Sequence, residues 1–299
     1  MATKVRIRDT RSDRIYTAWT GIILTLLTLS VLYPLIYVIS ASFSNPHAVN
    51  AGKMWLWPVQ ATVDGYRTVF EYHQIVTGFL NSLFYALVGA FISVSLTLLA
   101  AYPLSRRDLV GRGPIMVFFL IPLVFSGGII PTYLVVHDLG LLNTRWALVI
   151  PGAVSVFQVI VTRTFFMATI PEDLLEATRV DGCSDFRFFF RMVLPLSKPI
   201  IAVNALFYAV AQWNSWFNAL IYLTNEHLFP LQLVLRQILI LNSVDPSQVS
   251  DASLLAHQQA LQDLLKYGLI VIASIPPLLA YPFVQKHFVK GFMVGSLKG

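Results

Sequence analysis

The feature that most constrains this chain is a series of long segments without a single charged residue. The first three are residues 15–46, 74–105 and 113–136. Each is long enough to cross the hydrocarbon core of a membrane as a helix, which takes about 20 residues. Only 12% of the residues are charged, against about 25% in ordinary soluble domains, so a soluble surface of this size could not be covered with charge. The sequence therefore predicts an all-helical integral membrane protein.

Six transmembrane helices are predicted in total. The fourth runs from residue 146 to 162 or a little beyond, the fifth lies within residues 199–225, and the sixth runs over residues 267–285. Arg163 sits at the end of the fourth, where its long side chain can reach the interface. Gly127 and Gly128 in the third segment predict either a break in that span or close helix packing. We expect residues 1–14 to precede, and residues 287–299 to follow, one undivided membrane domain at residues 15–286.

The distribution of basic residues predicts the orientation. With a cytoplasmic N-terminus, 16 of the 21 lysines and arginines fall on the inner side. The positive-inside rule then places both termini and the loop at 168–198 in the cytoplasm, and the loop at 224–266 outside. The net charge of +6 is thereby assigned to cytoplasmic loops and not to nucleic-acid binding. The first hydrophobic run exceeds the core of a secretory signal, about 7 to 15 residues, which favours an uncleaved signal-anchor.

Patterns typical of enzymes and metal sites are missing. Cys183 is the only cysteine, which excludes an intrachain disulfide and the Cys₄ and Cys₂His₂ zinc sites. The six histidines lie too far apart for a helical zinc pair, and neither G-x-S-x-G nor G-x-x-x-x-G-K-[ST] occurs. We expect no catalysis, metal or bound cofactor in this chain. The predicted spans contain no Asp or Glu, which disfavours a self-sufficient secondary carrier but leaves it as an alternative.

The fifth span has a polar face. At about 100° per residue, an arc of about 120° holds Asn204, Tyr208, Gln212, Ser215 and Asn218. Amides without partners are costly in hydrocarbon, so this face must meet another helix or a hydrated path. Helix-to-helix hydrogen bonding and the wall of a pathway for a polar solute are equally open interpretations. Trp213 and Trp216 fit either stacking on sugar rings or packing.

The outer loop carries a second helical pattern. Ser250 or Asp251 can cap a helix that contains five leucines, namely Leu254, Leu255, Leu261, Leu264 and Leu265. This helix is predicted either to contact an external partner or simply to extend the sixth span.

The inner loop at 168–198 begins with the signals of a short helix. Pro171 suits a first helical turn, and Glu172 and Asp173 complement the positive end of the helix dipole. Gly182 is placed to end the helix after about three turns.

A second helix is predicted directly after this one. Ser184 or Asp185 can cap it, and two prolines at 195 and 199 close it before the fifth span. Arg187 and Arg191 share one face, with phenylalanines over much of the rest, which suits a membrane interface. The loop is therefore a helix, a turn and a second helix.

These residues resemble a signature of the permease subunits of ATP-binding cassette (ABC) importers: E-A-A, three residues, G, nine residues, I, one residue, L-P. The spacing matches throughout, at Glu176, Ala177, Thr178, Gly182, Met192, Leu194 and Pro195. Thr178 stands for the usual alanine and Met192 for the usual isoleucine. The segments EATRVDG, LPLSKP, WNSWFNALIYL and KGFMVGSLKG resemble the carbohydrate branch, which includes the six-span maltose permease subunit. The segment SGGIIPTYLVV and the tail are most similar to the group that handles fragments of complex polysaccharides such as alginate or pectin.

The resemblance covers nearly the whole chain and implies the type I ABC importer permease fold. It implies that the helix from Glu172 to Asp181 is a coupling helix that docks on an ATPase subunit. The coupling residues would be Glu176, Ala177, Thr178, Asp181, Gly182, Leu194 and Pro195. Expected partners are a second permease subunit, two ATPase subunits that use ATP and Mg²⁺, and an extracytoplasmic solute-binding protein contacted by residues 224–266. The expected substrate is an oligosaccharide, with an acidic uronate oligomer favoured, imported across the inner membrane of a bacterium.

Overall fold

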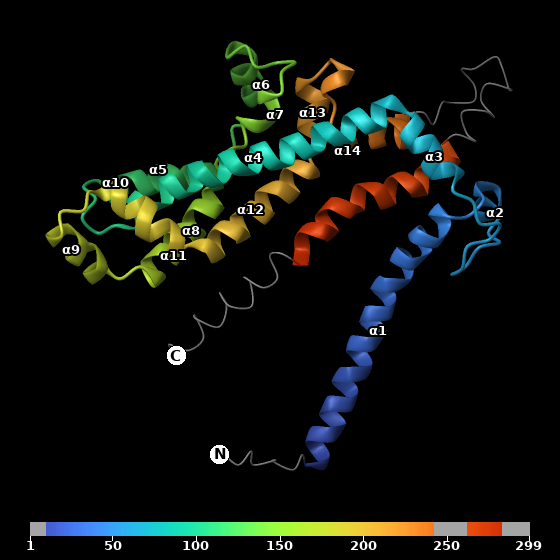
Figure 1. Ribbon diagram of the computed structural model, residues 1–299, viewed down its shortest axis with the longest axis horizontal. Helices are drawn as coiled ribbons and strands as arrows, with labels where there is room; N and C mark the ends of the chain where they lie inside the picture. The colour runs from blue at the N-terminus through green and yellow to red at the C-terminus, as the bar shows by residue number, and fades with distance from the viewer. Residues whose placement is uncertain (1–9, 242–261, 283–299) are drawn as a thin grey trace. The chain divides into compact units, whose positions relative to one another are not determined.

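The computed structural model describes residues 10–241 and 262–282, and all regular elements in these ranges are helical (Figure 1). Contacts group the chain into two compact units. Of the described residues, the first comprises 10–71 with 262–271, and the second comprises 72–241 with 272–282. The sequence shows no linker at these boundaries, so two units were not expected.

The first unit contains α1 (Arg11–Ser42), α2 (Pro46–Asn50), α3 (Asp64–Glu71) and the first part of the helix Gln262–Pro282. Thr10 and Asp13 form a capping box at the start of α1, which fixes where this span begins. Most of α1 is exposed, as suits a helix that faces lipid or another subunit. Its last turn packs with α2 around a small core that contains Val49 and Met54, and Asn50 Nδ2 donates to Asp263 Oδ2 at 2.6 Å.

The second unit is built around α4 (His73–Ser105). The other α-helices are α5 (Arg112–Val124), α6 (Ile129–Asp138), α7 (Trp146–Val149), α8 (Val156–Thr169), α9 (Glu172–Val180), α10 (Asp185–Phe188), α11 (Leu194–Leu196), α12 (Lys198–Trp213), α13 (Phe217–Tyr222) and α14 (Leu231–Arg236). Two π-helices, η1 (Phe189–Val193) and η3 (Gln237–Leu241), and one 3₁₀-helix, η2 (Glu226–Leu228), complete the described elements.

Small residues along α4 let its neighbours approach closely. α4 packs against α12, α8 and α14 (Figure 1). A Cβ at Gly78 would lie 3.3 Å from Leu231 Cα, and a Cβ at Gly89 would lie 3.0 Å from the Gln212 side chain. Such small-residue contacts are the usual means of close helix packing in membranes. The core between these helices includes Ala101, Val159 and Phe166.

The predicted spans agree with the helices only in part. Among the described residues, three helices are long and apolar enough to cross a membrane: Arg11–Ser42, His73–Ser105 and Gln262–Pro282. The third predicted span is broken, because α5 and α6 meet at 117°, and Gly128 at the break has φ of +82°. With each bent helix pair taken as one span, the number of candidate spans rises to five.

The fourth and fifth predicted spans are not continuous helices, and that expectation was wrong. α7 ends at Val149, two residues before Pro151, which has no N–H to continue the helical hydrogen bonds, and α8 begins only at Val156. α12 ends at Trp213, and α13 starts at Phe217. At this second break the Asn214 amide donates to the Val210 carbonyl at 2.9 Å, so the side chain competes with the backbone for that acceptor.

Candidate functional site

The predicted coupling helix is present as α9, with the predicted end. Pro171 is its N-cap, one residue before the first turn where it was expected, and Glu172 and Asp173 occupy that first turn. Gly182 has φ of +75°, a left-handed conformation that glycine adopts without strain. Its N–H donates to Arg179 O at 3.0 Å, and the Cys183 N–H donates to Thr178 O at 2.9 Å. These two bonds form a Schellman motif, which ends the helix.

α9 has one packed face and one open face. Thr178 is buried, and its hydroxyl donates to Leu175 O at 2.9 Å. Glu176, Ala177 and Asp181 are exposed, as are Gly182 and the apolar side chain of Val180. An exposed face that mixes a carboxylate with apolar atoms suits contact with another protein.

The predicted second helix is built from three short pieces. Ser184 Oγ accepts the Arg187 N–H at 3.4 Å and caps α10, and the chain then continues through the π-helix η1 into α11. Pro195 has no N–H for the carbonyl four residues earlier, and the widened π turn accommodates that loss. Val193 is buried and Leu194 is partly buried, whereas Pro195 is exposed.

The α10–η1 segment is anchored by two adjacent aromatic residues. Phe188 and Phe189 are buried in the same core as α4 and α8. Phe186 and Phe190 are exposed and stack on each other with ring centroids 6.1 Å apart. The segment is thus held firmly while it presents aromatic surface.

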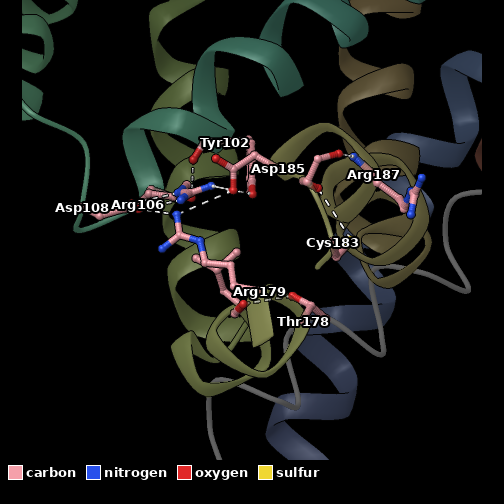
Figure 2. A network of polar contacts seen from close by, with 11 residues as sticks. Tyr102, Arg106, Asp108, Thr178, Arg179, Cys183, Asp185 and Arg187 are labelled. Atoms are coloured by element: carbon pink, nitrogen blue, oxygen red, sulfur yellow. Dashed lines mark hydrogen bonds and ion pairs between the residues drawn. The ribbon is translucent and has the colours of Figure 1, made fainter. Parts of the chain in front are cut away.

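A cluster of four charged side chains, which the sequence analysis missed, joins this loop to the end of α4 (Figure 2). Arg106 Nη2 lies 2.6 Å from Asp108 Oδ2, and Arg106 Nη1 lies 2.8 Å from Asp185 Oδ1. Arg179 Nη2 lies 2.8 Å from Asp108 Oδ2 and 3.6 Å from Asp185 Oδ1. We call these four residues the ion cluster.

The two arginines set the electrostatics of the ion cluster. Hydrogen bonds from Arg106 and Arg179 hold the pKa of Asp108 well below its usual range. The contribution of this carboxylate to stability is therefore present at neutral pH and is lost progressively as the pH falls from the ordinary pKa of an aspartate through the lowered pKa. Because 46% of the Asp108 side chain is exposed, screening by water keeps that contribution small.

A cleft of about 490 Å³ lies between α9, the end of α8 and residues 105–108. Glu172, Glu176 and Arg179 line its α9 side. Arg107 Nε pairs with Glu172 Oε1 at 2.9 Å, so the first turn of α9 is also bound to the segment after α4. The described residues contain no group of three or more His, Cys, Asp or Glu side chains that could hold a metal ion.

Three of the predicted pathway residues make contacts with neighbouring helices. Asn204 Nδ2 donates to Thr162 Oγ1 at 2.8 Å, and the Tyr208 hydroxyl lies 2.7 Å from Thr97 Oγ1. Gln212 Nε2 donates to Leu148 O at 3.3 Å. Of the two interpretations left open by the sequence, these contacts favour helix-to-helix hydrogen bonding for this half of the stripe.

The rest of the predicted polar stripe does not continue on the same helix, which corrects the helical-wheel prediction. The break at residues 214–216 removes Ser215 and Asn218 from the face of Asn204. Trp213 is buried, and its indole N–H donates to Ala273 O at 2.9 Å. Trp216 is partly exposed, and the Arg236 guanidinium lies 4.2 Å from its ring centroid. Both tryptophans thus have protein partners, and Asn218 is exposed.

The described part of the predicted outer loop is folded against the opposite end of α4. Asn81 Nδ2 donates to His227 O at 2.7 Å, and the Tyr85 hydroxyl donates to Leu228 O at 2.8 Å. Ser82 Oγ accepts the Leu231 N–H at 2.8 Å. Of the predicted leucine helix, residues 264 and 265 lie in Gln262–Pro282; its start, like the tail at 287–299, lies outside the described residues.

The sequence matches a known protein family and is similar to known proteins over most of its length. Residues 93–294 match the family described as "Binding-protein-dependent transport system inner membrane component". The chain is 43% identical over 276 residues to "Polygalacturonan/rhamnogalacturonan transport system permease protein YtcP" of Bacillus subtilis (strain 168), which covers 92% of this chain and 96% of the relative. It is 37% identical over 299 residues to "Protein LplC" of the same organism, which covers both chains completely.

A solved structure has the same fold over almost the whole chain. It is described as "Crystal structure of a bacterial ABC transporter involved in the import of the acidic polysaccharide alginate". The matched chain is 31% identical, with a TM-score of 0.86, and the match covers 95% of this chain and 100% of that chain.

Proposed function

The chain belongs to the family of binding-protein-dependent transport system inner membrane components, the permease subunits of ABC importers, and on that premise we propose that it carries fragments of acidic polysaccharides into the cell. It is a multi-pass inner-membrane subunit and not an enzyme. The main support for this substrate class is the 43% identity, over 92% of the chain, to a permease for polygalacturonan and rhamnogalacturonan. The structural match to an importer of the acidic polysaccharide alginate supports the same class.

The proposed assembly contains a second permease subunit, two ATPase subunits that bind ATP and Mg²⁺, and an external solute-binding protein. In this proposal the chain crosses the membrane six times with both termini in the cytoplasm. α9 docks on an ATPase subunit through Glu176 and its exposed neighbours, and closure of the ATPase pair moves α9. Residues 224–241 lie on the side that meets the binding protein. Of the predicted pathway residues, the proposal keeps a substrate contact for three, namely Ser215, Trp216 and Asn218.

Reversal of charge at Glu176 is expected to weaken binding of the ATPase subunit. Glu176 is exposed on α9 and lines the cleft, so Glu176→Lys changes a contact surface without removing packing. Like charges at an interface cost several kcal/mol. We therefore expect at least about a tenfold loss of co-purified ATPase subunit, measured by quantitative pull-down from detergent extracts.

Glu71→Lys is the matched control for this change. Glu71 is exposed on α3, and within the described part of the chain its ion pair is with Arg67 on its own helix, at 3.2 Å. The control should retain the ATPase subunit at the level of the unsubstituted chain. Equal retention by Glu176→Lys and Glu71→Lys would remove α9 from the proposed docking surface.

The substrate class is tested on the cognate solute-binding protein. Calorimetric titration with matched neutral and uronate oligomers of two to four residues is expected to give tighter binding of the uronates. Charged groups held by buried hydrogen bonds are discriminated strongly, because a neutral analogue leaves their partners unpaired. Tight binding of neutral oligomers alone would refute the acidic substrate, while the assignment as an importer subunit would stand.

A further inference from the structure

α9 is connected to the transmembrane helices by two physical routes. The first is the chain itself, which leads from α9 through α10, η1 and α11 into α12. The second is the ion cluster, which leads from α9 directly to the end of α4. The family signature lies on the first route only.

We propose that Arg106 and Asp108 are positioning residues that fasten α9 to α4, so that movement of α9 is passed to α4 directly as well as along the chain into α12. This inference rests on the proposed function, because it takes α9 to be the helix that an ATPase subunit moves.

The ion cluster forms a closed ring and not a set of separate pairs. Two cations and two anions alternate, so each side chain has two partners of opposite charge at 2.6 to 3.6 Å. The ring joins three segments: the C-cap of α4, the last turn of α9 and the first residue of α10. Isolated ion pairs at the surface contribute little to stability, whereas several charges that form a network with good geometry contribute more.

Arg106 is the member best suited to hold the ring together. Only 12% of its side chain is exposed, and its planar guanidinium binds both carboxylates at once. The Arg106 Nη1 also donates to the Tyr102 hydroxyl at 3.3 Å, one turn back on α4. A lysine could not reproduce this fork of donors.

α9 is contacted at both of its ends. Arg107 binds Glu172 in the first turn, and Asp108 binds Arg179 in the last turn. These two contacts come from adjacent residues of one segment. The segment continues α4 directly, because the Arg106 N–H donates to Pro103 O at the helix end.

α4 is the helix for which such a fastening has the widest effect. It packs along α8 and α12, and at its other end Asn81, Ser82 and Tyr85 hold residues 227–231. A helix of 33 residues is about 50 Å long. A shift of α9 passed to α4 would therefore reach the segment proposed to lie near the binding protein.

The rigid link can be measured with spin labels in the assembled transporter. Cys183 is the only cysteine, so it provides one label beside the ion cluster, and Leu96→Cys provides the second on an exposed position of α4. Pulsed EPR distances are compared between the nucleotide-free and the vanadate-trapped complex, with and without Asp108→Asn. We expect the distance to stay constant in the parent and to change on trapping in Asp108→Asn. A distance that changes in both proteins, or in neither, would overturn the proposal.

Substrate-stimulated ATP hydrolysis gives an independent test of the ring. Asp108→Asn and Arg179→Gln are each expected to reduce stimulation about 3- to 30-fold in proteoliposomes, because the ring opens in either case. The double variant should lose no more stimulation than the single variant with the larger loss, because residues that act as a unit give losses that do not add. Losses that multiply, or unchanged stimulation in both single variants, would overturn the proposal.

The controls separate this inference from the proposed function. Arg67→Gln breaks an exposed pair in the other unit and should leave stimulation unchanged. If the unsubstituted chain bound no ATPase subunit, the proposed function would fail. If it bound the ATPase and transported normally while the ring variants did the same, only the fastening would fail.

Discussion

Gly182→Pro is expected to reduce substrate-stimulated ATP hydrolysis strongly while the transmembrane helices stay folded. Proline fixes φ near −65°, whereas Gly182 has φ of +75°, and proline cannot make the hydrogen bond from Gly182 N–H to Arg179 O. The change would move the end of α9 away from the start of α10 and break the ion cluster between Arg179 and Asp185. The left-handed conformation alone costs a residue other than glycine about 1–2 kcal/mol. A cost of this size corresponds to about a tenfold change in rate, so we expect stimulated activity to fall at least about tenfold.

The matched control for this variant is Gly52→Pro. Gly52 has φ of +68° and ends α2 with the same pair of bonds: its N–H donates to Val49 O at 3.0 Å, and the Lys53 N–H donates to Ala48 O at 3.0 Å. The same local damage, placed at the end of α2 in the first unit, should leave coupling largely intact. Circular dichroism and size-exclusion chromatography of both variants verify the fold. Stimulated activity that is equal in the two variants would remove Gly182 from the coupling site.

The start and end of α9 could be predicted from the sequence because their causes are local. An acidic first turn and a glycine after the last turn act within a few residues, and the structure has both at the expected places. The π-helix η1 depends on Pro195 as well, but its exact register follows from how Phe188, Phe189 and Val193 enter the core. A local pattern cannot supply that information.

The ion cluster could not be predicted from one sequence because its members are far apart in the chain. Arg106 and Asp185 are separated by 79 residues, and Asp108 and Arg179 by 71. The segment SRRDLVGR after the second span was visible only as basic charge that set the orientation. The aspartate placed directly after two arginines is the one local sign that it contacts another segment.

The polar stripe of the fifth predicted span could also be predicted only in part. Helical periodicity placed Asn204, Tyr208 and Gln212 on one face, and this holds along α12. It could not tell what that face meets, and it assumed a helix that Asn214 interrupts. Thr97, Thr162 and the Leu148 carbonyl come from other helices, so only the packed structure identifies them as partners.

Gly65→Val should lower the stability of the first unit more than Gly65→Ala or Gly21→Val. A Cβ at Gly65 in α3 would lie 2.7 Å from the Leu264 carbonyl oxygen, which is closer than real Cβ contacts come. This neighbour is a backbone atom in the helix Gln262–Pro282, so it cannot rotate away as a side chain would. Gly268, on the same helix, approaches Gly65 in turn, with its added Cβ 3.8 Å from Gly65 C. The two glycines therefore form the close approach of these helices.

The expected loss follows from overpacking, which typically costs about 1–3 kcal/mol. For a chain of this size, that corresponds to a fall of roughly 2–4 °C in Tm per kcal/mol, measured by thermal unfolding in detergent. Gly21→Val is the matched control, because Gly21 is also helical and nothing lies within 4 Å of its added Cβ. Both changes exchange glycine for the same β-branched residue, so their intrinsic helix propensities cancel in the comparison. Gly65→Ala should fall between them, since it adds the clashing atom without the two further methyl groups. Equal Tm values for Gly65→Val and Gly21→Val would mean that α3 and the last helix do not pack through their glycines.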